Sequence, residues 1–283
     1  MTVGLLAVLG VGVLDPHTPV LRADDAGLTR GDGCFEGCSV RTDDAGHSTV
    51  DKLDAHLARM RRSAAALELA FDARAWRALI GTALTTWSAP GEAAMKLVLT
   101  RGPADDAPSG LLTISPLPAG YPDQRRDGIA VITLSRGTSA DAFADAPWLL
   151  GGVKTLSYAV NMAAQRAASR HRAHDVIFVS TDGFALEAPT SSVVWSSGRT
   201  LHTTPLGATG ILGGTTQQLL FERAAAAGWQ TEQALGTPAD LHRAESLWLI
   251  GSVRGPVDVV AIDGTPRARD ERRTAEIRGL CGF

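Results

Sequence analysis

A single lysine at position 154 follows a pair of glycines and precedes an apolar stretch, within residues 151–156. Glycine lets the backbone approach a ligand closely, because it carries no side chain that would intervene. A lysine removed from water has a lowered pKa and acts as a nucleophile through its neutral amine. The segment is therefore suited to a nucleophilic amine, but taken alone it favours an exposed lysine at the start of a helix, since lysine is normally exposed.

Residues 211–217 place two glycines and two threonines directly before a stretch that we predict to be helical. Free backbone N–H groups at a helix N-terminus, together with threonine hydroxyls, form a natural phosphate site. The alternative is an ordinary glycine turn with a threonine cap.

Two charged side chains, Glu187 and Arg59, are further candidates for binding a ligand. Glu187 is a lone acid among small and hydroxyl residues, where it could hold a cationic ring nitrogen; a polar turn is the alternative. Arg59 follows His56 by three residues on a predicted helix, and arginine binds phosphate bidentately; a solvated helix face is the alternative. With Lys154 and residues 211–217, these side chains supply what pyridoxal 5'-phosphate (PLP) needs: an amine for its aldehyde, an acid for its pyridine nitrogen and donors for its phosphate.

The apolar pattern predicts the elements that must position these residues. A helix begins near Asp51, whose carboxylate suits the N-cap. Further helices are expected at 156–171 and at 216–227, the latter closed by Gly228. The apolar stripe of the first helix is Leu53, Leu57, Met60, Ala64 and Leu67. Strands are expected at 3–14, 33–40, 96–101, 111–115, 129–134, 176–180, 192–195 and 246–251.

A breaker-rich stretch, residues 116–123, predicts an interdomain linker. We therefore expect a mixed α+β chain with a small N-terminal α/β domain (1–118), a linker (119–127) and a larger C-terminal domain (128–283).

The composition excludes several classes of protein. Of 283 residues, 45% are apolar, which suffices for a sizeable core. Acidic residues (30) slightly exceed basic ones (27), so nucleic acid is not an expected partner. No segment approaches the roughly 20 apolar residues that span a bilayer, so we expect a cytoplasmic protein without a membrane partner. Three cysteines, Cys34, Cys38 and Cys281, predict buried free thiols and neither a disulfide framework nor a metal site.

The order of these motifs resembles the class IV aminotransferases, which are the fold-type IV PLP enzymes. The resemblance extends from about residue 20 to about residue 265 and is carried by residues 31–36, 56–59, 154, 187, 213–216 and 251–252. It implies a D-amino-acid aminotransferase-like fold, with a small α/β domain and a larger pseudo-barrel domain. Members of the family are typically homodimers.

The resemblance also assigns roles to the matched residues. Lys154 joins covalently to the aldehyde of PLP, and Glu187 pairs with the protonated pyridine nitrogen. The other cofactor-binding residues hold the phosphate or lie near the ring, and they are Arg59, Thr190, Ser191, Thr215, Thr216 and Ser252. The family often has asparagine at the position of Ser192.

Within the family, residues 31–35, 95–102 and 154–162 resemble 4-amino-4-deoxychorismate lyase. Branched-chain enzymes carry arginine at the position of Lys96. D-amino-acid aminotransferases carry arginine and histidine in the loop where this chain has Asp105 and Asp106, two acids that would repel a substrate carboxylate. Bacterial lyases often have threonines and an arginine where Glu36, Gly37 and Ser39 stand, with side chains that we expect to face the pocket. The candidate carboxylate partners are Arg41, Lys96, Arg101 and Arg254.

The resemblance therefore implies a lyase that converts aminodeoxychorismate to 4-aminobenzoate and pyruvate, a step in folate biosynthesis. Lys154 would remove the proton from the carbon that bears the substrate amine. Two alternatives stay open: a transaminase of branched-chain or D-amino acids, and a protein that binds PLP or another small molecule without turnover. Aminodeoxychorismate supplied without a keto acid separates the lyase from the transaminase, because only the transaminase needs an acceptor.

Overall fold

The structure, a computed structural model, describes residues 3–104 and 107–283. It divides into two compact units, Met1–Pro118 with Val153–Ser157, and Ala119–Gly152 with Tyr158–Phe283. Residues 119–127, expected to be a linker, contain helix α4 (Gly120–Asp127) of the second unit. Pro122 lies in the first turn of α4, where a missing N–H removes no bond of the helix. The breaker-rich stretch therefore contains the boundary between the two units, after Pro118, and the start of a helix directly behind it.

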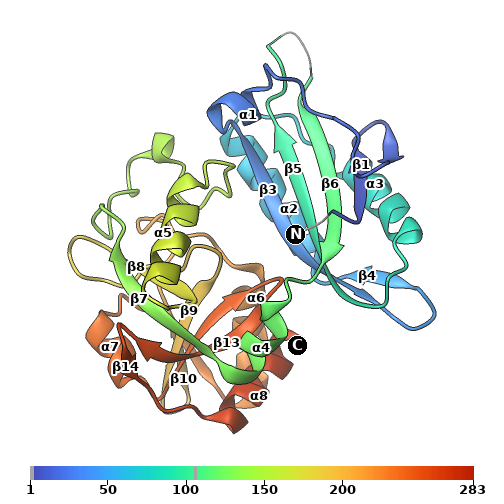
Figure 1. The fold of residues 1–283 in the computed structure, drawn as a ribbon. Helices are drawn as coiled ribbons and strands as arrows, with labels where there is room; N and C mark the ends of the chain where they lie inside the picture. The colour runs from blue at the N-terminus through green and yellow to red at the C-terminus, as the bar shows by residue number, and fades with distance from the viewer. Residues whose placement is uncertain (1–2, 105–106) are drawn as a thin grey trace. The chain divides into compact units, whose positions relative to one another are not determined.

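Among the described residues, the first unit contains a six-stranded antiparallel sheet in the order β2-β1-β6-β5-β3-β4 (Figure 1). The strands are β1 (Leu5–Val8), β2 (Gly12–Leu14), β3 (Gly33–Thr42), β4 (Ser48–Val50), β5 (Gly91–Thr100) and β6 (Ser109–Pro116). The helices are α1 (Ala26–Arg30), α2 (Leu53–Ala66) and α3 (Ala73–Thr86). The single strand expected at 3–14 is instead a hairpin, because the chain turns through Gly10 at a positive φ of 78°.

One face of this sheet packs against α2 and α3. Leu57, Met60 and Ala64 of the predicted stripe are buried in that core, and Leu53 and Leu67 pack against it, so the stripe is confirmed. The expected N-cap is wrong: Lys52 occupies it in a left-handed conformation. The Asp51 carboxylate instead accepts a hydrogen bond from Nε of Arg41, at 3.0 Å.

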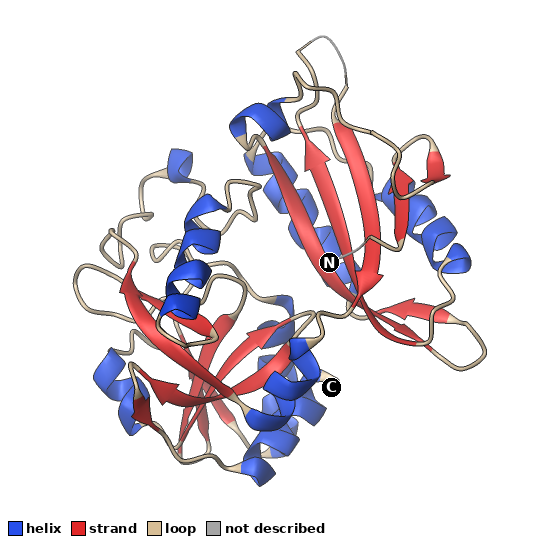
Figure 2. Cartoon of the chain, in the orientation of Figure 1, coloured by secondary structure: helices blue, strands red, loops and turns tan. Residues whose placement is uncertain are grey.

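The second unit contains an eight-stranded mixed sheet among its described residues, in the order β11-β10-β9-β12-β13-β7-β8, with β14 paired to β13 (Figure 2). The strands are β7 (Ile129–Ser135), β8 (Asp175–Val179), β9 (Ser192–Ser197), β10 (Thr200–Thr203), β11 (Gln230–Gln233), β12 (Ser246–Gly251), β13 (Gly255–Ile262) and β14 (Thr265–Pro266). The helices besides α4 are α5 (Ala159–Arg170), α6 (Thr215–Ala224), α7 (Pro238–Arg243) and α8 (Glu271–Cys281), with 3-10 turns at Pro147–Leu149 and Ala225–Ala227. Gly228 ends the second 3-10 turn in the left-handed conformation, as predicted.

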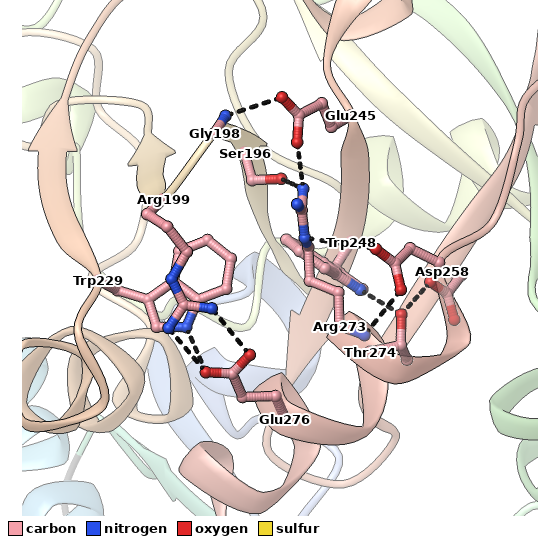
Figure 3. A network of polar contacts seen from close by, with 11 residues as sticks. Ser196, Gly198, Arg199, Trp229, Glu245, Trp248, Asp258, Arg273, Thr274 and Glu276 are labelled. Atoms are coloured by element: carbon pink, nitrogen blue, oxygen red, sulfur yellow. Dashed lines mark hydrogen bonds and ion pairs between the residues drawn. The ribbon is translucent and has the colours of Figure 1, made fainter.

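A polar network fixes α8 to the sheet of the second unit (Figure 3). The Trp229 ring is buried, and its Nε1 donates to Glu276 at 2.8 Å. The guanidinium carbons of Arg199 and Arg273 lie 4.0 and 5.6 Å from the ring. Guanidinium groups over an indole face are attracted by its π electrons, so this cluster holds the helix through ionic and aromatic contacts together.

No helix in the described ranges has the length and apolar character needed to cross a membrane.

Candidate active site

Lys154 lies on a short segment that extends the sheet of the first unit at the edge of β3. The N–H of Phe35 donates to the carbonyl of Lys154 at 3.0 Å, and the N–H of Leu156 donates to the carbonyl of Gly33 at 2.9 Å. A further bond runs from the N–H of Lys154 to the Ser63 hydroxyl on α2. This pairing explains why α5 begins at Ala159 and not at the predicted residue 156: the backbone of Lys154 and Leu156 is hydrogen-bonded to β3, with a bridge at Thr155.

Two amines meet the ring of Phe35. Because paired residues of antiparallel strands point to the same face, Lys154 projects on the same side as Phe35. Lys96 on β5 pairs with Gly37 and shares that face. The amine nitrogens of Lys154 and Lys96 lie 4.4 and 5.2 Å from the ring centroid, and so at most about 10 Å from each other. Lys96 and Lys154 thus approach one aromatic ring from opposite sides of β3.

The opposite face of β3 carries a buried charge cluster. Glu36 is fully buried and accepts hydrogen bonds from Nε and Nη2 of Arg59, each at 2.7 Å. Its carboxylate also lies 2.7 Å from Nδ1 of His56. The expectation that Glu36 faces the pocket is therefore wrong: strand alternation turns it toward α2, with Gly37 and Ser39 on the other face. His56 and Arg59 are likewise buried beside β3, and not on a solvated helix face.

The electrostatics of this cluster follow from its burial. Burial by itself would raise the pKa of Glu36, but the hydrogen bonds from Arg59 and His56 outweigh it and lower the pKa to about 2. Burial lowers the pKa of His56, and the bond to Glu36 offsets only part of that effect. Glu36 is therefore ionised and His56 neutral at physiological pH, so Nδ1 of His56 is the donor in their hydrogen bond.

In the second unit, Glu187 lies in the loop between β8 and β9. Its carboxylate accepts the N–H of Leu212 at 3.0 Å. The following turn is closed by a bridge between Ala188 and Ser191. From the start of α5, the Tyr158 hydroxyl and the Asn161 amide donate to the carbonyl of Pro189 at 2.6 and 2.8 Å. The turn that carries Thr190 and Ser191 is thus anchored by side chains from α5.

Three hydroxyls converge at the N-terminus of α6. The Ser252 oxygen lies 2.9 Å from that of Thr215 and 3.2 Å from that of Thr216. Thr215 and Thr216 are the first two residues of α6, where backbone N–H groups have no partner within the helix. Hydroxyls and helix-end amides together form a donor set that suits a phosphate group.

Of the four candidate carboxylate partners, the three arginines each form an ion pair with an aspartate of the chain. Arg41 pairs with Asp51 and lies six residues along β3 from Phe35, roughly 20 Å at the usual rise of a strand. Arg101 donates to Asp32 at 2.5 Å and to the carbonyl of Leu67. Arg254 is buried against Asp175, at 2.7 Å. Of the four, Lys96 is the one whose charged group lies over the Phe35 ring that Lys154 also contacts.

The remaining expectations concern cysteines and acids. All three cysteines are buried free thiols, as predicted, and burial raises the pKa of Cys34 to about 12. Such thiols are protonated and unreactive at neutral pH. In the described part of the chain, no three potential metal ligands gather. Asp105 and Asp106, expected to repel a substrate carboxylate, lie outside the described residues.

Comparison with known proteins agrees with this geometry. The family model described as "Amino-transferase class IV" matches residues 33–262. A bifunctional aminodeoxychorismate lyase / D-amino acid transaminase of Mycobacterium tuberculosis is 40% identical over 270 residues, covering 92% of both chains. A PLP-bound structure of a hypothetical aminotransferase from the same organism is 39% identical, with a TM-score of 0.91 and 98% of both chains covered. A fold IV-transaminase from Curtobacterium pusillum is 37% identical, with a TM-score of 0.90 and 99% of both chains covered.

The chain belongs to the class IV aminotransferase family. It is an enzyme with the fold-type IV architecture, so the predictions of family and fold class are confirmed. The enzymes of this class use PLP, as the sequence predicted for this chain.

Sequence reasoning missed the role of Glu36. Its neighbours two positions away, Cys34 and Cys38, are apolar, and alternation along β3 places all three on one buried face. A buried acid needs a charged or donating partner, so the pattern predicts one. The alternation of β3 is the signal that could have directed attention to Arg59 and His56, the basic residues of the neighbouring helix.

Proposed function

We propose that this enzyme is a PLP-dependent aminodeoxychorismate lyase, which produces 4-aminobenzoate and pyruvate. The observation that carries the proposal is the pair of amines at Phe35, because it combines a reactive amine with a separate cation. The similarity to the bifunctional enzyme of M. tuberculosis supports the same activity.

Lys96 suits the shape of this substrate. Aminodeoxychorismate carries its amine and its ring carboxylate at opposite ends of a six-membered ring, whereas an amino acid carries both groups on one carbon. A cation that reaches the Phe35 ring from the other side of β3 is therefore suited to a carboxylate that is remote from the reacting amine. We assign Lys96 to the ring carboxylate.

The second unit supplies residues that fit the cofactor. Ser252, Thr215 and Thr216 offer hydroxyls and helix-end amides to a phosphate. Glu187 is the acid for the pyridine nitrogen, and the turn with Thr190 and Ser191 lies directly after it. In the first unit, Arg59 is a further phosphate donor, because a guanidinium carries five N–H donors and can bind more than one anion.

When bound, PLP supplies an aldehyde that combines with amines and an electron-poor ring that stabilises negative charge on the adjacent carbon. Glu187 favours that stabilisation by keeping a proton on the ring nitrogen. Lys154, as a neutral amine, would take the proton from the substrate carbon that bears the amine. The neighbouring C–O bond breaks, and the departing enolpyruvate gains a proton at its methylene carbon to become pyruvate. Loss of both groups leaves an aromatic ring.

The test is an assay of the purified enzyme with aminodeoxychorismate and no keto acid. We expect catalytic release of equal amounts of 4-aminobenzoate and pyruvate. Lys154→Met should abolish the formation of both products, and the absorbance band of covalently bound PLP should disappear. Lys96→Met should raise KM at least about tenfold, as expected for loss of a charged hydrogen bond, with a smaller change in kcat. Absence of products from the wild-type enzyme would refute the lyase assignment.

A second candidate activity is D-amino-acid transamination, favoured by the same bifunctional relative. Turnover only when a D-amino acid and a keto acid are both supplied would support it over the lyase. Bound PLP without turnover in either assay would instead support a binding protein.

We also propose that the enzyme is a homodimer. Trp148, Leu149 and Val160 of the second unit are large apolar side chains with 75, 46 and 57% of their surface exposed. Trp148 and Leu149 are adjacent in the chain, and large exposed apolar side chains that lie next to one another are typical of protein interfaces. Light scattering coupled to gel filtration measures the mass directly, and a monomeric mass at micromolar concentration would refute this.

A further inference from the structure

Arg254 is a buried arginine that joins three elements of the second unit. It is 7% exposed, and its Nη2 donates to Asp175 at 2.7 Å and to the Ser191 hydroxyl at 3.2 Å. Its Nη1 donates to the side chain of Gln124 on α4, at 3.3 Å. Asp175 begins β8 and is fully buried. The guanidinium therefore bonds to residues that lie far apart in the sequence.

Two of the joined segments carry proposed cofactor residues. Ser191 belongs to the turn that follows Glu187, while Arg254 lies two residues after Ser252, in the turn between β12 and β13. These turns touch: a Cβ added to Gly251 would lie 3.1 Å from the Ser191 hydroxyl and 3.2 Å from the carbonyl of Thr190. Arg254 thus links the turn proposed to lie near the ring to the turn proposed to hold the phosphate.

The backbone of the Ser252 turn is fixed from its other side. Arg125 on α4 donates from Nε to the carbonyl of Arg254 at 2.6 Å and from Nη2 to the carbonyl of Val253 at 2.9 Å. The turn is therefore held by one arginine through its carbonyls, and it holds the Ser191 turn through a second arginine. A planar guanidinium fixes the angle between its acceptors, which a flexible ammonium cannot do.

We propose that Arg254 is a positioning residue for PLP, which fixes the turn of Thr190 and Ser191 relative to Ser252. This rests on the proposed function, because it takes those residues as cofactor contacts. Arg254 acts through Ser191, and both of its Nη atoms donate to side chains of the chain itself. A buried ion pair orients its partners strongly, because separating them leaves a charge without compensation.

The test compares PLP binding by variants of the full chain after the cofactor has been removed. Arg254→Gln deletes the charge, and Asp175→Asn/Arg254→Gln replaces the ion pair by two neutral amides that keep the fold. Arg254→Lys keeps the charge without the planar geometry. The control is Arg269→Gln, because Arg269 also pairs with an aspartate in this unit, Asp258, at 3.1 Å, but contacts neither turn. The readouts are the Kd of PLP, the visible circular dichroism per bound cofactor, and the melting temperature without PLP.

We expect the single and double glutamine variants to weaken PLP binding at least about tenfold, which is the loss of one to two hydrogen bonds, and to reduce the visible dichroism. The Kd of PLP for Arg254→Lys should lie between that of the glutamine variants and that of the wild type. Arg269→Gln should bind PLP with the same Kd as the wild type. The proposal is overturned if the double variant binds PLP within twofold of the wild type with unchanged dichroism, whatever its melting temperature. A wild-type chain that takes up no PLP would instead overturn the proposed function itself, and this inference with it.

Discussion

Replacing Glu36 by glutamine should destabilise the enzyme at neutral pH while keeping the size and shape of the side chain. Glu36 lies fully buried between Arg59 and His56, and its pKa is lowered from an ordinary 4.5 to about 2. That difference corresponds to about 3 kcal/mol of stability at pH 7. The same figure is at the lower end of the roughly 3–5 kcal/mol expected for leaving a buried charge unpaired, here the guanidinium of Arg59.

The pH dependence gives the sign of the effect. Because the folded-state pKa of Glu36 lies below its unfolded value, the unfolded chain binds more protons between these two values. The stabilisation is therefore complete above about pH 4.5 and is lost as the pH falls toward 2. In Glu36→Gln this contribution is absent, so the variant should lose less stability than the wild type over the same interval.

The assay is urea unfolding followed by tryptophan fluorescence, at pH 7 and at steps down to pH 3. A matched control is Asp54→Asn, because Asp54 pairs with Arg77 in the same unit but is 84% exposed. Exposed pairs contribute at most about 1 kcal/mol, so the control should stay close to the wild type. If Glu36→Gln unfolds at pH 7 with a free energy within about 1 kcal/mol of the wild type, the description of this cluster as a stabilising buried charge is refuted.

Two further predictions concern packing. Gly33→Ala should lower the free energy of unfolding by about 2 kcal/mol and reduce PLP uptake, because its Cβ would lie 2.5 Å from the carbonyl oxygen of Leu99. Gly81→Ala, at an open position in α3, should be neutral or stabilising by up to about 1 kcal/mol. If Gly81→Ala melted at a lower temperature than Gly33→Ala, the close contact at Gly33 would be contradicted. Trp229→Phe should cost about 1–2 kcal/mol through the lost hydrogen bond to Glu276 and weaker cation–π contacts (Figure 3). Equal melting temperatures for Trp229→Phe and the wild type would count against the network.

Local patterns predicted much of the fold. The helical stripe from Leu53 to Leu67 is buried as its spacing requires, and the strand expected at 246–251 is β12. Gly228 ends its turn in the conformation that glycine adopts most easily. These features depend on neighbours within a few residues, so the sequence contains the information that defines them.

Features that depend on distant partners were not predicted. Nothing in the residues around Lys154 shows that this segment pairs with β3, because its partner, Cys34, lies far away in the sequence. The partner of a buried arginine is equally hidden: Asp175 lies 79 positions from Arg254, and Glu36 lies 23 positions from Arg59. Both arginines were recognised as able to bind anions, and the structure adds that each also pairs with a carboxylate of the chain itself.

Each unit contains one such buried pair beside proposed site residues. Glu36 is flanked in β3 by Phe35, whose N–H binds the carbonyl of Lys154, and Arg254 contacts Ser191. Buried ion pairs add little net stability compared with apolar residues of similar size, because desolvation offsets most of their attraction. Stability alone therefore does not explain two of them at these positions, whereas fixing the orientation of adjacent groups does. It follows that replacing both members of either pair by apolar side chains should leave a folded protein in which PLP is held less firmly.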